Sequence, residues 1–366
     1  MYDIRERVLG CIMAGMKKKV KRLVSDLNTK RHIIKEKDEI NRYIRVSNEQ
    51  VAQLTEQQKQ EIVSYWAQFG ISVGTSWHRL FYFKTGNPDP RFVPRTVFNY
   101  TVKPKMNDER FVRGWGDKAY LDYFLRDVKT PQCIVRNVSG RLLNESFELI
   151  SRQEAIEILG RYERFVVKPA VDTDTGKGVK LMTKPFDFEA LFREYKANYV
   201  CQIPIQQHEG MMLLNQTSVN TIRMNTVLLG KEAHVMSCFV KVGEAGKFAD
   251  NNGSQRFFIG IDPQNGTMRD YAIDHSIQKY SSIPSGYAFA GEKIPCFDKV
   301  CEAVCRAHRS LPHFGFAFWD VAVDAEGDAV IIEVNLRRPD TNVAQGTGQP
   351  FFGEYTDVVM KAIRKL

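Results

Sequence analysis

Residues 316–340 read FAFWDVAVDAEGDAVIIEVNLRRPD, two β-rich runs separated by the turn sequence Ala-Glu-Gly-Asp. This pattern predicts a hairpin that brings Asp320 of the first strand beside Glu333 and Asn335 of the second. Side chains alternate between the two faces of a strand, so 333 and 335 point the same way, and Arg337 continues that face. Two carboxylates and an amide oxygen suit Mg²⁺, with phosphates completing its coordination. The alternative is a solvated polar face, but the intervening positions are apolar and the acids are clustered.

Residues 165–182, FVVKPAVDTDTGKGVKLM, form a second stretch that points to phosphate chemistry. A predicted strand ends at Lys168-Pro169, and a polar loop with Gly176 and Gly178 leads into another strand. Glycines leave backbone N–H groups free to face phosphate oxygens, and a fixed lysine adds a positive charge. The spacing is not that of the Walker loop, and the lysine precedes the glycines, unlike in kinases. Taken alone, the stretch is equally consistent with an ordinary hairpin.

The composition is that of a globular chain, with 366 residues, 43% hydrophobic and 26% charged. It excludes collagen, disorder, coiled coils and small disulfide scaffolds. The net charge is +9, and residues 1–45 contribute +7 of it from 13 Lys/Arg against 6 Asp/Glu. The basic character therefore belongs to a helix predicted over 3–45, so we expect no nucleic-acid partner. That helix could contact an anionic membrane or polysaccharide, although a solvated face is the commoner meaning of such a charge run.

The cysteines and the hydropathy of the chain indicate its cellular compartment. Seven cysteines are scattered without a CxxC pair, which favours buried reduced thiols over zinc or redox chemistry. No apolar run approaches the ~18 residues that a membrane span requires. We therefore expect a soluble, cytoplasmic protein.

The periodicity of the chain predicts an α+β fold, with strands and helices segregated by lobe in a mixed, largely antiparallel arrangement. We expect helices at 3–45, 55–69, 118–127, 151–159, 186–196, 296–310 and 354–365. We expect strands within 133–143, 164–170, 199–205, 222–230, 233–243, 257–262, 317–324 and 329–337. The proline-rich segment 84–95 reads as a loop.

Together and in this order, these motifs resemble the ATP-grasp superfamily. Lys118, in GWGDKAYLDYFL, matches the first nucleotide lysine of that superfamily, Lys168 matches the second, and YVCQIPI at 199–205 resembles the linker along which adenine lies. The resemblance implies ATP and Mg²⁺ (with Mn²⁺ as an alternative) as cofactors, and an ATP-grasp fold of two subdomains behind an N-terminal helical extension. It implies nucleotide contacts at Lys118, Lys168, Gly176, Lys177, Gly178, Gln202, Ile203, Ile205 and His208, and metal ligands at Asp320, Glu333 and Asn335.

One branch matches more closely, the ATP-grasp proteins associated with sugar transfer and surface-polysaccharide gene clusters. Its features are SYWAQFG, Trp77-His78, SVNTIR at 218–223 and Lys241-Val242-Gly243. Gln202 stands where other ATP-grasp groups often have an acidic residue. The expected divisions are an N-terminal helical region at 1–70, a pre-ATP-grasp region at 71–130, a small subdomain with the glycine-rich flap at 131–205, and a large subdomain with the metal site at 206–366.

The resemblance implies an ATP-dependent carboxylate–amine ligase that works through an acyl phosphate and modifies a surface sugar or its precursor. Such chemistry needs charge neutralisation more than a protein nucleophile. Arg223 is the candidate for the transferring phosphoryl group, Lys241 for phosphate or substrate, and Arg337 falls where carboxylase-type members carry an arginine. The partners would be a small carboxylate and an amine. A sugar or small-molecule kinase and a non-catalytic nucleotide-binding module remain alternatives, and the sequence leaves the oligomeric state open.

Overall fold

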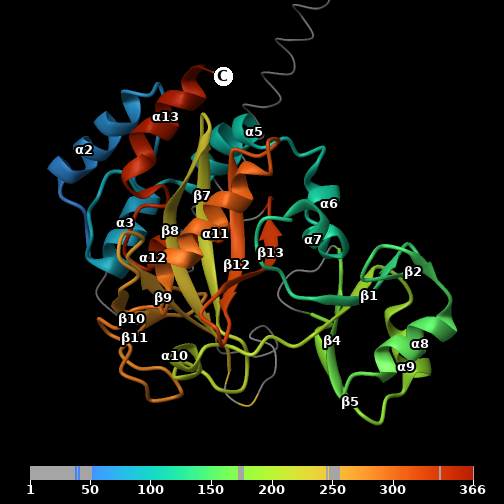
Figure 1. Cartoon of the computed structure of the whole chain (residues 1–366). Helices are drawn as coiled ribbons and strands as arrows, with labels where there is room; N and C mark the ends of the chain where they lie inside the picture. The colour runs from blue at the N-terminus through green and yellow to red at the C-terminus, as the bar shows by residue number, and fades with distance from the viewer. Residues whose placement is uncertain are drawn as a thin grey trace, which may run out of the picture.

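A computed structural model describes residues 38, 40, 41, 52–171, 177–244, 246, 256–337 and 339–365. The chain forms a larger and a smaller lobe, each built on one antiparallel sheet (Figure 1). The predicted helix over 3–45 lies outside the described residues except at three positions, where the backbone is helical and Ile40 is buried. Gly176 and residues 250–255 also lie outside them.

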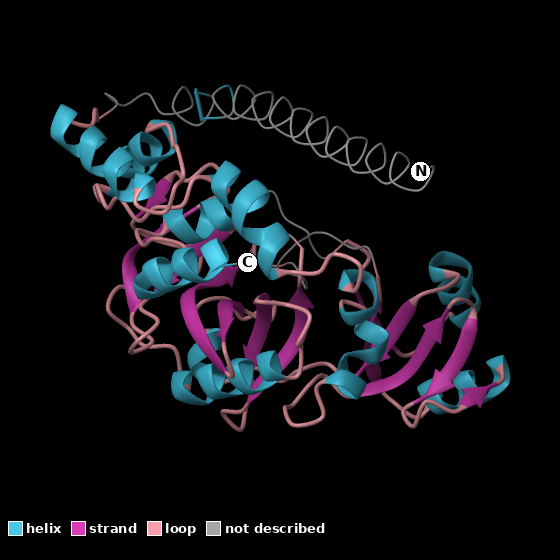
Figure 2. Ribbon diagram, turned by 90° about the horizontal axis from the view of Figure 1, so that it is seen from above, coloured by secondary structure: helices cyan, strands magenta, loops and turns pink. Residues whose placement is uncertain are grey.

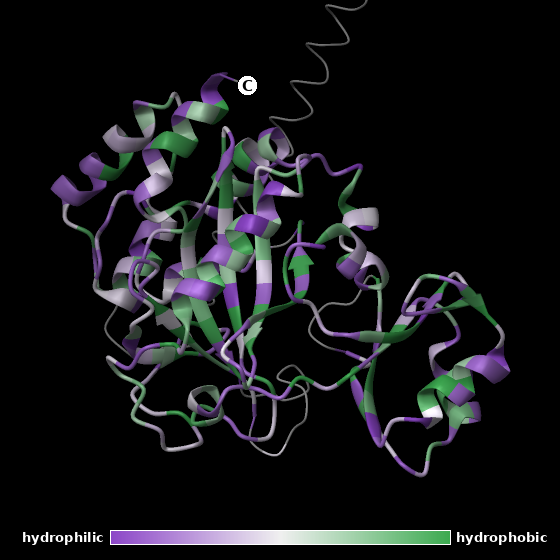
Figure 3. Cartoon of the chain, viewed as in Figure 1, coloured by the Kyte–Doolittle hydropathy of each residue, from purple (hydrophilic) through white to green (hydrophobic). Residues whose placement is uncertain are grey.

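The large sheet has seven strands in the order β11-β10-β9-β8-β7-β12-β13, with every neighbouring pair antiparallel. Its strands are β7 (Thr221–Leu229), β8 (Glu232–Val242), β9 (Phe257–Ile261), β10 (Met268–Ile273), β11 (Lys279–Tyr280), β12 (Phe316–Val323) and β13 (Ala329–Asn335). In Figure 3 the hydrophobic residues concentrate on these strands, as expected for a sheet that is covered on both faces.

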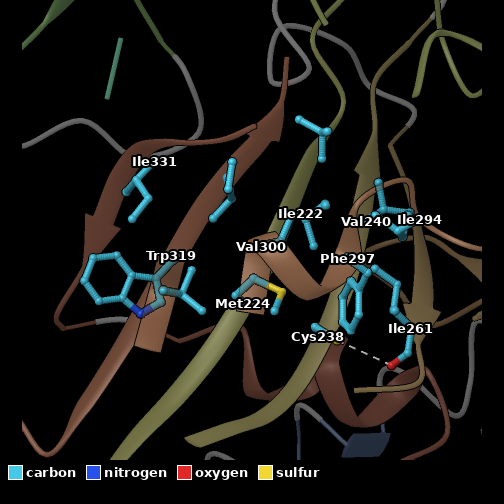
Figure 4. Close-up of a cluster of buried hydrophobic side chains, with 14 of the residues drawn as sticks. Ile222, Met224, Cys238, Val240, Ile261, Ile294, Phe297, Val300, Trp319 and Ile331 are labelled. Atoms are coloured by element: carbon cyan, nitrogen blue, oxygen red, sulfur yellow. Dashed lines mark hydrogen bonds between the residues drawn. The ribbon is translucent and has the colours of Figure 1, made fainter. Parts of the chain in front are cut away.

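Helix α11 (Phe297–Arg309) covers one face of the large sheet (Figure 1). Alternate strand residues such as Met224, Cys238 and Trp319 point toward it and are fully buried (Figure 4). The other face packs its aromatic residues, including Phe239 and Phe318, against the N-terminal and C-terminal helices. These helices are α2 (Glu56–Ala67), α3 (Ser76–Thr85), α12 (Thr341–Gly346) and α13 (Thr356–Lys365). Figure 2 shows helices on both sides of the strands of the large lobe.

The small sheet has six strands in the order β3-β2-β1-β6-β4-β5. They are β1 (Cys133–Val138), β2 (Arg141–Asn144), β3 (Leu149–Ile150), β4 (Arg164–Pro169), β5 (Lys180–Thr183) and β6 (Tyr199–Gln202). Helices α8 (Arg152–Gly160) and α9 (Phe188–Tyr195) cover one face and share a separate apolar core with it. The opposite face carries Lys168, Val200 and Arg136 in one cross-strand row. This face therefore remains available for polar chemistry.

Short helical turns between residues 95 and 124 connect the lobes. They are α4 (Arg95–Val97), η1 (Phe98–Val102), α5 (Lys103–Met106), α6 (Val112–Trp115), η2 (Lys118–Tyr120) and α7 (Leu121–Phe124). Within the described part of the chain, no helix combines the length and the apolar character needed to cross a membrane.

The α+β prediction is confirmed, and each predicted strand region contains an observed strand. The sequence analysis missed β10 and the helix over Ser76–Thr85. It also overestimated the helix at 118–127, where the structure has two short turns, η2 and α7, in its place. The predicted largely antiparallel arrangement is confirmed as well, since the neighbouring strands of both described sheets run antiparallel.

Candidate functional site

A buried carboxylate lies at the centre of a row of charged side chains across the large sheet. Asp320 of β12 lies opposite Arg223 of β7 and opposite Glu333 of β13. Arg223 donates from Nε to Oδ1 at 2.7 Å and from Nη2 to Oδ2 at 3.3 Å, and Lys241 Nζ of β8 lies 2.8 Å from both oxygens. All three side chains are at least nine-tenths buried. Asp320, Arg223 and Lys241 therefore form one buried ion-pair network.

The electrostatics of this network follow from burial and proximity. Burial alone would raise the pKa of Asp320, but the charges and hydrogen bonds of Arg223 and Lys241 outweigh it and hold that pKa well below its usual range. Burial is the largest single effect on the pKa of Arg223 and lowers it, but the charges of Asp320, Asp340 and Glu333 and the hydrogen bond to Asp320 together outweigh burial and raise that pKa. Asp320 and Arg223 are therefore both charged at neutral pH.

A second contact joins the large sheet to the segment that leads into the small lobe. Glu333 Oε2 lies 3.0 Å from Lys118 Nζ, and Glu333 Oε1 accepts from Asn335 Nδ2 at 3.2 Å. The predicted shared face of 333 and 335 is thus confirmed. Lys118 begins the 3₁₀ turn η2, whose N-cap Asp117 accepts from the Ala119 N–H at 2.8 Å. This cap fixes the turn that presents the lysine.

Lys168 completes the cluster from the small sheet. It lies on β4 and is 7% exposed. Burial lowers the pKa of Lys168 to about 8, and the neighbouring positive charge of Lys118 adds to the lowering, while Glu333 and Asp320 oppose it. Two lysines and two carboxylates from separate parts of the chain therefore influence one another across the junction of the lobes.

The residues predicted to hold the adenine lie at the end of β6. Gln202 is buried and its Nε2 lies 3.5 Å from the Pro131 carbonyl, while the Ile203 N–H donates to the Gln132 carbonyl at 3.0 Å. Ile205 is partly buried. His208 Nδ1 accepts from the Gly210 N–H at 3.0 Å and caps α10 (Glu209–Met212). This capping gives the histidine a structural role, and its nucleotide contact stays a prediction.

Two residues of the predicted flap lie within the described part of the chain. Lys177 is exposed. Gly178 has φ +81°, and a Cβ there would lie 3.0 Å from Pro169 Cγ, so a larger residue would be strained. Its carbonyl accepts from the Tyr195 hydroxyl at 2.7 Å, which ties the return of the loop to α9.

The prediction that Arg337 continues the face of Glu333 and Asn335 was wrong. Strand β13 ends at Asn335, and a bend over 336 and 337 interrupts the alternation of side chains. Arg337 is exposed and its charge acts on Glu109, whose pKa is lowered mainly by Lys103. The sequence analysis also missed Asp340, whose Oδ2 lies 3.5 Å from Arg223 Nη1. No sequence signal marks that contact, since Asp340 follows the strand in irregular structure.

The donor set fits a magnesium ion in part. Among the described residues, no group of three or more His, Cys, Asp and Glu side chains converges on one point. Glu333 and Asn335 offer oxygens side by side, which suits a hard cation. The lone pairs of Asp320 are already engaged by Arg223 and Lys241, so Asp320 fits a metal only if these cations move.

A small and a large antiparallel sheet, joined where two lysines meet two carboxylates, define this molecule as an ATP-grasp protein. The sequence agrees with this class over most of its length. Residues 97–352 match the family described as sugar-transfer associated ATP-grasp, and the chain belongs to that family. No curated protein sequence matches the chain.

Solved structures with partial likeness include several ligases. They include the L-amino acid ligase from Bacillus licheniformis (17% identity, 64% of this chain, 43% of that chain, TM-score 0.37). The VanG D-Ala:D-Ser ligase from Enterococcus faecalis aligns at 12% identity over 68% of this chain and 61% of that chain, with a TM-score of 0.42. The match thus spans less than two thirds of either structure's length.

Proposed function

We propose that this protein is an ATP-dependent ligase that joins a carboxylate to an amine through an acyl phosphate. The 3.0 Å contact between Lys118 and Glu333 carries the proposal. It brings a cation from the start of the small lobe onto the last strand of the large sheet, where Lys168 also acts on Glu333. A site with cations on one side and carboxylates on the other suits a nucleotide triphosphate with its metal.

The nucleotide would lie between the two sheets. Lys118 and Lys168 would bind its α- and β-phosphates, and the linker at 202–205 would contact the adenine. Arg223 and Lys241 would turn from Asp320 to the γ-phosphate, because its oxygens carry more charge than one carboxylate. Mg²⁺, or Mn²⁺, held by Glu333, Asn335 and the released Asp320, would supply neutralisation of phosphate charge.

The reaction would proceed in two steps. A carboxylate oxygen attacks the γ-phosphorus, the bond to the bridging oxygen breaks, and ADP leaves. The amine then attacks the acyl carbon, phosphate leaves with the C–O bonding electrons, and the amine loses a proton. Arg223 would stabilise the charge that develops on the transferring group and on the acyl oxygen. The products are an amide, ADP, phosphate and a proton.

We also propose a substrate class and a cellular compartment for this reaction. The family description supports a sugar, or the precursor of a surface polysaccharide, as the source of one reacting group. We place the reaction in the cytoplasm, where ATP is supplied and where reduced cysteines such as Cys133, Cys201 and Cys238 persist.

Hydroxylamine tests the acyl phosphate directly. It replaces the amine and converts an acyl phosphate into a hydroxamate, which gives a coloured complex with Fe³⁺. We expect hydroxamate together with ADP and free phosphate when the protein is given MgATP and a panel of amino acids, uronic acids and sugar acids. A stable phosphorylated sugar, formed without hydroxamate or free phosphate, would make the protein a kinase and contradict the proposal.

Glu333→Gln tests the site. We expect it to lower turnover by about a hundredfold or more, since it removes one charge of the metal and phosphate site. The matched control is Glu326→Gln, because Glu326 is an exposed acid in the turn between the same two strands, 3.9 Å from Lys129. Wild-type turnover by Glu333→Gln at saturating substrates would show that the assignment is wrong.

A further inference from the structure

A polar cleft lies in the small lobe, between the β1–β2 hairpin and helices α8 and α9. Its volume is about 520 Å³. Arg141, Arg152 and Lys196 line it together with apolar residues, and no acidic residue is among the described residues of its lining. Leu149 at its edge is 70% exposed. The cleft therefore combines positive charge with an uncovered apolar surface.

The register of the small sheet places this cleft away from the candidate nucleotide site. Lys168, Val200 and Arg136 form one cross-strand row, and Pro169, Tyr199 and Asn137 form the next. Neighbouring rows point to opposite faces of a sheet. Asn137 lines the cleft, so the cleft opens on the face opposite to Lys168.

Two of the three cations are available for a ligand. Arg152 is fixed, since it lies 2.7 Å from Glu189 and its guanidinium stands 4.6 Å above the Phe192 ring. Neither Arg141 nor Lys196 forms an ion pair with a described residue, and both are exposed. These two charges match a phosphate monoester, which carries close to two negative charges at neutral pH.

Backbone segments with positive φ border the cleft on two sides. Lys196 has φ 55° and ψ −64°, and the flanking carbonyl of Tyr195 accepts from the Ala197 N–H at 2.5 Å. Ser139 and Asn198 also have positive φ, at 51° and 56°. The positive φ of Ser139 belongs to the two-residue hairpin turn that it forms with Gly140, whereas Lys196 has a conformation that a lysine rarely adopts.

Hydrogen bonds hold the hairpin turn at 139–140 and the loop at 196–198 together. Asn137 is 4% exposed, and its Oδ1 accepts from the Gly140 N–H at 2.9 Å and the Asn198 N–H at 3.2 Å. Asn198 Oδ1 accepts from the Ser139 N–H at 2.8 Å. Lys196 is thereby presented to the cleft on a braced loop, as a preformed site requires.

We propose that this cleft is a second ligand site, separate from the nucleotide site, for a phosphate monoester attached to an apolar or aromatic group. Arg141 and Lys196 bind the phosphate, and Leu142 and Phe192 pack against the attached group. A soluble ester and a lipid headgroup share this chemistry.

The first experiment measures binding of phenyl phosphate to the full chain by isothermal titration. We expect Arg141→Gln and Lys196→Gln each to weaken binding by about tenfold or more, since each removes a charged hydrogen bond. Lys184→Gln is the matched control, because Lys184 is an exposed lysine of the same lobe paired with Glu163 at 2.7 Å. Lys168→Met reports on the opposite face and should leave this binding unchanged. Binding that survives both cleft substitutions, or that only Lys168→Met removes, would overturn the proposal.

A second variant separates ligand binding from folding. Lys196→Gly suits a positive φ, so it should leave stability to urea unchanged or higher while it weakens phenyl phosphate binding. Greater stability with unchanged binding would show that the strain serves only the loop, and would overturn the proposal. Vesicles with and without phosphatidic acid identify the source. Co-sedimentation that is lost in the cleft variants indicates a lipid headgroup, and phenyl phosphate binding without it indicates a soluble ester.

Discussion

Replacement of Asp320 by asparagine should destabilise the protein strongly. The substitution keeps the shape of the side chain but leaves Arg223 and Lys241 without their counter-charge, in positions that are 3% and 6% exposed. Breaking a buried ion pair by removing one partner costs about 3–5 kcal/mol, because the remaining charge is left uncompensated. Two cations share this carboxylate, so we expect a loss in the upper half of that range.

Urea unfolding, followed by tryptophan fluorescence, measures this loss, since Trp319 is the neighbour of Asp320 in β12 and is fully buried. The matched control is Asp328→Asn, because Asp328 is a half-exposed acid near Lys129 and Lys299 and its replacement should leave the midpoint almost unchanged. Adding Lys241→Met to the Asp320→Asn variant should recover part of the loss, because it removes one of the two stranded charges.

The pH dependence gives an independent check on this reasoning. The pKa of Asp320 is depressed in the folded protein, so its stabilising effect is full above its unfolded value of about 3.9 and is lost as pH falls through the folded value. The gap between wild type and Asp320→Asn should therefore be constant near neutrality and should narrow in acid. An Asp320→Asn variant that unfolds within 1 kcal/mol of wild type at pH 7 would refute the network as a source of stability.

Two further predictions concern the stability effects of Lys168 and Gly353. Because burial lowers the pKa of Lys168 to about 8, the folded protein binds fewer protons than the unfolded chain between about pH 8 and 10.4, so stability should rise with pH across that window. Urea midpoints should show this rise in wild type and its absence in Lys168→Met, which should be the more stable variant at pH 7. Gly353→Ala should lower stability by about 1–3 kcal/mol, since φ is 53° and the new Cβ would lie 2.6 Å from the Met236 carbonyl oxygen. Gly74→Ala, with nothing within 4 Å of the added carbon, should show no such loss in the same assay.

Local pattern predicted much of the fold and part of the site. The alternation in β13 was enough to place Glu333 and Asn335 on one face, because a strand repeats every two residues whatever it packs against. The same rule failed at Arg337, since the strand ends two residues earlier and the sequence carries no marker for that end. Strand ends depend on pairing with neighbours, which local sequence does not contain.

The pairing of Asp320 with Arg223 and Lys241 was beyond sequence reasoning. Its residues are separated by 97 and 79 positions, and only the register of three antiparallel strands brings them together. The sequence analysis therefore assigned Asp320 to a metal and both cations to phosphate, with no indication that they neutralise one another in the folded chain. Strand β10 was missed for a different reason. Its apolar pattern is interrupted by Arg269 and Asp270.

The ion pairs at the junction of the lobes make ligand binding an exchange of counter-ions. Asp320 and Glu333 neutralise cations that the proposed mechanism assigns to phosphates, and the same carboxylates are the proposed metal ligands. A metal that bound alone would take the carboxylates and leave these cations without a counter-charge. A nucleotide that bound alone would take the cations and leave the carboxylates without a counter-charge. Each ligand therefore removes the electrostatic penalty of the other, and linkage requires this help to be reciprocal. The protein would thus bind the metal–nucleotide complex as a unit and discriminate against either component by itself.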